Sequence, residues 1–111
     1  MVAMAQLIPD DPQEQASVLA VLREHPELRG FIAKASAKAE ELFPGATMHL
    51  DTVQYDEWDP PLTLIVNAPA PWPEYQASRD RFIHWLVEQP EFDLDRMLVM
   101  PQWTGDLDTA P

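Results

Sequence analysis

The distribution of proline constrains the fold of this chain more than any other feature. Its 111 residues include twelve prolines but only three glycines. The prolines form no continuous tract, because they fall between segments whose apolar residues recur at helix or strand spacing. Since proline lacks a backbone N–H and interrupts both helices and central strands, these positions divide the chain into short elements with stiff connections. Hydrophobic residues make up 46% of the chain, enough to predict one folded domain over residues 1–111.

Two helices are predicted in the first half of the chain. Asp11 can cap the first, with Pro12 at its first position and Glu14 three residues after the cap, so we assign residues 12–24 to it. Pro26 begins the second helix, which ends at Pro44-Gly45. One stripe of this helix is apolar at steps of three and four residues: Leu28, Phe31, Ile32, Ala35, Ala39, Leu42 and Phe43.

The remaining segments predict three strands and a further helix. Residues 46–55 and 62–68 alternate in the manner of strands and form an antiparallel hairpin. A helix begins at Pro73 and is closed by Pro90. The apolar run within residues 94–100 predicts a third strand that ends at Pro101.

The resulting order is α-α-β-β-α-β, which predicts an α+β fold with two layers. The sheet is expected to be small and mainly antiparallel, made of the hairpin plus the third strand, with the helices packed on one face. Residues 1–10 are expected to be a loose leader and residues 102–111 a flexible tail. The second face of the sheet, which carries Val53, Tyr55 and Ile65, is either covered by the leader or exposed for association.

The chain is strongly acidic, with 19 acidic against 7 basic residues and a net charge of −12. No lysine or arginine occurs between Ala39 and Ser78. Nucleic acids and bilayer surfaces are themselves anionic, so we expect neither direct nucleic-acid binding nor membrane binding. A basic protein partner is favoured, because opposite charges steer association. The alternative is that the acidity serves solubility.

Several classes of chemistry are excluded or disfavoured by the residues present. There is no cysteine, so disulfides and thiolate sites are excluded, and no signal or membrane span is evident. We therefore expect a cytoplasmic protein. Serine elbows and phosphate-binding glycine loops are absent from the sequence, and no cofactor is predicted.

His49 and Asp51, together with a nearby carboxylate such as Asp56 or Asp59 of the turn, suggest a hydrolytic or metal site. At this spacing on a strand both side chains share a face, and imidazole and carboxylate together bind divalent metals. A small hydrolase or metal-binding protein is therefore one alternative. The simpler interpretation of the pair is two solvated side chains on the outer face of the sheet.

The hairpin connection is the predicted binding site. It gathers five residues that suit recognition of a basic protein: Tyr55, Asp56, Glu57, Trp58 and Asp59. Trp58 offers a large amphipathic contact, whereas Trp72 and Trp103 are more readily explained as lids over the edge of the core. The sequence thus favours a non-enzymatic protein-binding module, such as an antitoxin, immunity protein, inhibitor or adaptor. A homo-oligomeric structural protein, including a homodimer, is the other alternative.

Overall fold

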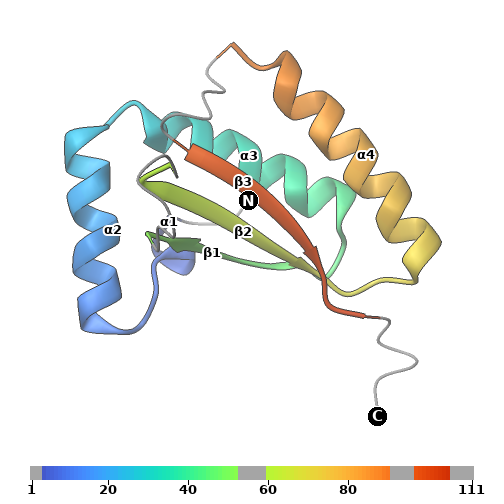
Figure 1. The fold of residues 1–111 in the computed structure, drawn as a ribbon, viewed down its shortest axis with the longest axis horizontal. Coiled ribbons are helices and arrows are strands. Elements are labelled where there is room, and N and C mark those ends of the chain that lie inside the picture. Colours follow the sequence, from blue (N-terminus) through green and yellow to red (C-terminus); the bar gives the residue numbers. More distant parts are fainter. Residues whose placement is uncertain (1–3, 53–59, 91–96, 106–111) are drawn as a thin grey trace.

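A computed structural model of the protein describes residues 4–52, 60–90 and 97–105 (Figure 1). Apart from a single helical turn at the start, the elements follow the predicted order α-α-β-β-α-β, which confirms the α+β fold. They are α1 (Met4–Leu7), α2 (Pro12–Glu24), α3 (Leu28–Leu42), β1 (Thr47–Asp51), β2 (Leu62–Ala68), α4 (Trp72–Glu88) and β3 (Met97–Trp103).

The helix ends follow from local capping. The Asp11 side chain accepts a hydrogen bond of 3.1 Å from the Glu14 N–H, and Pro12 occupies the first position of α2, as predicted. Pro26 does not begin α3 itself. It lies in a tight turn in which the Leu28 N–H donates to the His25 carbonyl, and the helix begins at Leu28. At the other end of α3, Gly45 has a φ of 81°, which glycine adopts readily.

The sheet has strand order β1-β2-β3 and is mixed, whereas the sequence predicted a mainly antiparallel sheet. The β1–β2 hairpin is antiparallel, with Leu50 opposite Leu64. The β2–β3 pair is parallel, with Leu64 opposite Val99. The parallel pair follows from the topology, because α4 carries the chain back along the sheet before β3 begins.

The end of β3 differs from the prediction. The strand continues through Pro101 to Trp103, so residues 102 and 103 belong to the sheet and not to a tail. Proline is tolerated here because β3 is an edge strand, where some backbone groups have no neighbouring strand to bond. Of the residues predicted for this strand, 94–96 lie outside the described part of the chain.

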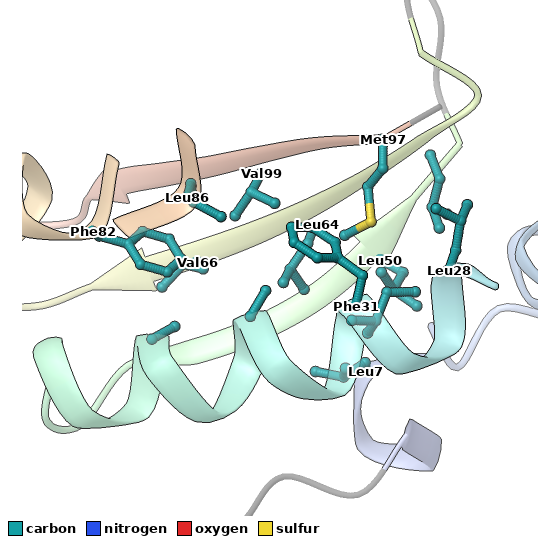
Figure 2. Close-up of a cluster of buried hydrophobic side chains, with 14 of the residues drawn as sticks. Leu7, Leu28, Phe31, Leu50, Leu64, Val66, Phe82, Leu86, Met97 and Val99 are labelled. Atoms are coloured by element: carbon teal, nitrogen blue, oxygen red, sulfur yellow. The ribbon is translucent and has the colours of Figure 1, made fainter. Parts of the chain in front are cut away.

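The core lies between the sheet and α3 and α4, on the face to which the helices pack. Along β2, buried residues alternate with half-buried ones, as a sheet covered on one face requires. Figure 2 shows Phe31 of α3 and Phe82 of α4 pointing into this layer beside Leu64 and Val66.

Residues 4–10 are also part of the packed structure. Leu7 is only 1% exposed and belongs to the core cluster (Figure 2), and α1 lies beside the edge strand β1 (Figure 1). Ile8 packs against the same cluster. The prediction of a loose leader therefore does not describe this segment, because Leu7 and Ile8 are held by the core.

Candidate functional site

The residues of the predicted recognition tip, Tyr55, Asp56, Glu57, Trp58 and Asp59, lie outside the described part of the chain. The antiparallel pairing of β1 with β2 confirms the hairpin in whose connection they occur. Their role in binding stays a prediction.

His49 and Asp51 share one face of β1, as predicted. They lie opposite Ile65 and Thr63 of β2, and both are half-buried. This is the face turned away from the core, because the intervening Leu50 is fully buried. Within residues 4–52, 60–90 and 97–105, no group of three or more histidine or acidic side chains is placed to hold a metal ion. The described residues therefore add no third ligand to this pair.

Two tryptophans form an aromatic platform where β3 ends and α4 begins. The rings of Trp72 and Trp103 meet edge to face with centroids 4.9 Å apart. Trp72 also stacks on Tyr75 at 5.7 Å, and the indole N–H of Trp103 donates to the Ala70 carbonyl at 2.8 Å. Despite these contacts, Trp72 is 44% exposed and Trp103 is 45% exposed. We call this pair the aromatic platform.

The backbone below the platform is fixed by the sequence. Prolines at 69 and 71 leave Ala70 with the only N–H of residues 69–71, and this N–H donates to the Gly105 carbonyl at 2.9 Å. Gly105 has a φ of 98°, a conformation that favours glycine. The Thr104 N–H donates to the Ala68 carbonyl at 3.2 Å. The connection from β2 to α4 is thus fastened to the end of β3.

A chain of ring contacts joins the platform to the core. Tyr75 lies 6.0 Å from Phe43, and Phe43 meets Phe82 edge to face at 5.6 Å. Phe82 in turn stacks on Trp85 at 6.2 Å. Offset and edge-to-face aromatic pairs add to the stability that burial alone gives. The exposed rings of the platform are therefore connected, through Tyr75, to the buried rings of Phe43 and Phe82.

The environment of Tyr75 favours the neutral form of its hydroxyl, as its raised pKa shows. Burial raises the pKa of Tyr75 above its ordinary value of 10.0, and the nearby Arg79 charge opposes this in part. The Arg79 guanidinium lies 5.8 Å from the centre of the Tyr75 ring, within the range of a cation–π contact. Near neutral pH this phenol is protonated.

A loss of stability at high pH is expected from Tyr75. Because its folded pKa exceeds the unfolded one, the contribution is present below about pH 10 and is lost as the pH rises through the folded value. Tyr75→Phe keeps the ring contacts but removes the titration, so its unfolding temperature should fall less between about pH 9 and pH 11. Thermal unfolding of both proteins measures this. Equal losses would show that the pKa of Tyr75 is the same in the folded and the unfolded protein.

A small cavity opens beside the platform. Its walls come from residues 42–44 at the end of α3, residues 68–70 after β2, and Glu74, Tyr75 and Ser78 of α4. The volume is about 70 Å³. Sites for drug-sized ligands or cofactors occupy roughly 300 to 1,000 Å³, so this cavity fits a single side chain.

Two apolar residues, Ile65 and Met100, lie side by side on the second face of the sheet. Ile65 of β2 lies opposite His49 on one side and Met100 on the other, and Met100 is exposed. Leu7 and Ile8 pack against the core, so they do not account for this face.

Comparison with known proteins gives no relative: no protein-family model, no curated protein and no solved structure matches the chain. In the described parts of the chain, none of the helices has both the length and the apolar character needed to cross a bilayer.

Proposed function

We propose that the protein is a non-enzymatic protein-binding module that recognises a basic partner. The observation that carries this proposal is the aromatic platform: two tryptophans, each nearly half exposed, fixed on a protein of net charge −12. The chain has no cysteine and so needs no oxidising compartment, and we place its action in the cytoplasm.

Fixed, exposed tryptophans suit recognition for an energetic reason. Tryptophan is enriched among the residues that dominate binding energy at protein interfaces. A side chain that is already ordered loses little conformational freedom on binding. Trp103 is held by its hydrogen bond to Ala70, and Trp72 is held between Trp103 and Tyr75. The platform is thus prepared for contact in the free protein.

The charge of the surroundings indicates the class of partner. Glu74 is exposed in the first turn of α4, two residues after Trp72 in the sequence. The nearest cation along the helix, Arg79, lies 3.5 Å from the Asp80 carboxylate. An anionic surface with exposed rings attracts lysine and arginine, both by long-range steering and by cation–π contact. The predicted tip at residues 55–59 has the same combination of acidic and aromatic residues in its sequence.

Loss of either platform tryptophan is expected to weaken the complex. The wild-type protein serves as bait to isolate a basic partner, and surface-plasmon kinetics then compare variants at several salt concentrations. Trp72→Ala and Trp103→Ala should each weaken binding by about 2 kcal/mol, or roughly 30-fold, mainly through faster dissociation. Association of the wild type should slow as salt rises, because steering is screened.

Two further variants make this experiment specific. Val87→Ala is the matched control, because Val87 is also apolar, lies on α4 and is 63% exposed, and binding should be unchanged. Trp58→Ala tests the predicted hairpin tip. If Trp58→Ala alone weakens binding, the tip is the site and the platform is not. An acidic partner, or binding indifferent to all three tryptophans, would contradict the proposal.

A further inference from the structure

We propose that the cavity beside the aromatic platform binds one lysine or arginine side chain of the basic partner, with the Glu74 carboxylate as its counter-ion. This inference rests on the proposed function and adds the specific contact by which a basic chain would be recognised.

The cavity lies where an incoming chain would meet the platform. Tyr75 forms part of its wall and is also the residue on which Trp72 stacks. The neighbouring strands β2 and β3 are parallel and both end at this side of the molecule (Figure 1). A segment lying on the tryptophans would therefore lie close to Ala70 and Tyr75, which line the cavity.

The size of the cavity matches one side chain. Its volume is about 70 Å³, whereas a single water needs roughly 10 to 15 Å³ on the same kind of measure. Several atoms in a row can therefore enter, but a nucleotide or another cofactor cannot. Lysine and arginine side chains have this extended form, with three or four methylene groups below the charged end.

The chemistry of the walls matches a side chain with an apolar stem and a charged end. Phe43, Pro44, Pro69 and Ala70 supply apolar surface, and Glu74 supplies a carboxylate. Among residues 4–52, 60–90 and 97–105, no cation pairs with Glu74. An anionic ligand is disfavoured by this carboxylate and by the net charge of −12. A purely apolar side chain would form no ion pair with the Glu74 carboxylate. The test must therefore distinguish a basic side chain from an apolar one.

Capped tripeptides provide the probe. Each places one central residue between two glycines: lysine, arginine, norleucine or glutamine. Binding to the isotope-labelled full chain is followed by amide and indole chemical shifts. We expect the lysine or the arginine peptide, or both, to bind with a dissociation constant of roughly 1 to 10 mM, as befits so few contact atoms. The shifts should concentrate at residues 42–44, 68–70 and 74–78 and at the platform indoles.

Two substitutions test the role of Glu74. Glu74→Gln should weaken binding of the basic peptides about two- to fivefold, the range for an exposed ion pair. Glu88→Gln removes the same charge from the far end of α4, about 21 Å away along the axis at 1.5 Å per residue, and should leave binding unchanged. Ser78→Met, which places a side chain in the cavity, should abolish binding while the remaining spectrum reports that the fold is kept.

The outcomes separate this inference from the proposed function. Norleucine binding as tightly as lysine and arginine, equal weakening by the Glu74 and Glu88 variants, or no shifts at the cavity would each overturn the pocket assignment. If the basic peptides fail while a basic partner still binds through Trp72 and Trp103, only the pocket is wrong. If the basic peptides bind as expected but no basic partner is captured, the pocket stands and the proposed function fails.

Discussion

Replacing Phe31 by alanine is expected to lower the free energy of unfolding by about 3 to 5 kcal/mol. Phe31 is 3% exposed and points from α3 toward the strand residues Leu64 and Met97 (Figure 2). Truncation removes a large apolar surface from the core and leaves a cavity that the surrounding strands can fill only in part. Urea unfolding followed by tryptophan fluorescence measures the change.

The control for this variant lies on the same helix. Arg29 is exposed on α3, and Arg29→Ala should change the free energy of unfolding by no more than about 0.5 kcal/mol. A loss below about 1 kcal/mol for Phe31→Ala would mean that the stripe beginning at Leu28 does not face the core. Such a result would contradict the packing of α3 against the sheet.

The elements that the sequence predicts well are those whose signals are local. The apolar stripe of α3 and the alternating pattern of β2 each depend only on residues close together in the sequence, and both are observed. The continuation of β3 past Pro101 is different, because a proline ends a strand only where its N–H is needed. Whether it is needed depends on β3 lying at the sheet edge, which is a property of the whole fold.

The same distinction explains what sequence reasoning missed at the candidate site. Trp72 and Trp103 are far apart in the chain, and their meeting depends on the parallel pairing of β2 with β3. The signal available in the sequence was the alternation of prolines before α4. Because these prolines leave Ala70 as the only backbone donor of residues 69–71, they indicate a stiff connection just before Trp72. The stacking of Trp72 on Tyr75 agrees with the interpretation of Trp72 as a lid, but that interpretation did not anticipate how much of the Trp72 and Trp103 rings stays exposed.

Deleting residues 1–9 is expected to lower the free energy of unfolding by about 2 to 5 kcal/mol. The main reason is Leu7, which is 1% exposed in the core cluster, while the partly buried Ile8 adds to the loss. Leu7→Ala alone should account for most of the effect, and the exposed Asp10 provides the control substitution Asp10→Ala. Urea unfolding of the three variants measures it. An unchanged stability would contradict the packing of α1 against the core.

The oligomeric state of the same variants decides what covers the second face of the sheet. Ile65 and Met100 lie side by side on that face, whereas Leu7 and Ile8 pack against the core, whose strand residues point the other way. Removing residues 1–9 should therefore leave the number of chains per particle, measured by light scattering, unchanged at concentrations where the protein stays folded. Leu7→Ala weakens the core but keeps the segment in place. Association of the deletion variant without association of Leu7→Ala would show that residues 1–9 shield the second face, and would contradict our placement of them on the helical side.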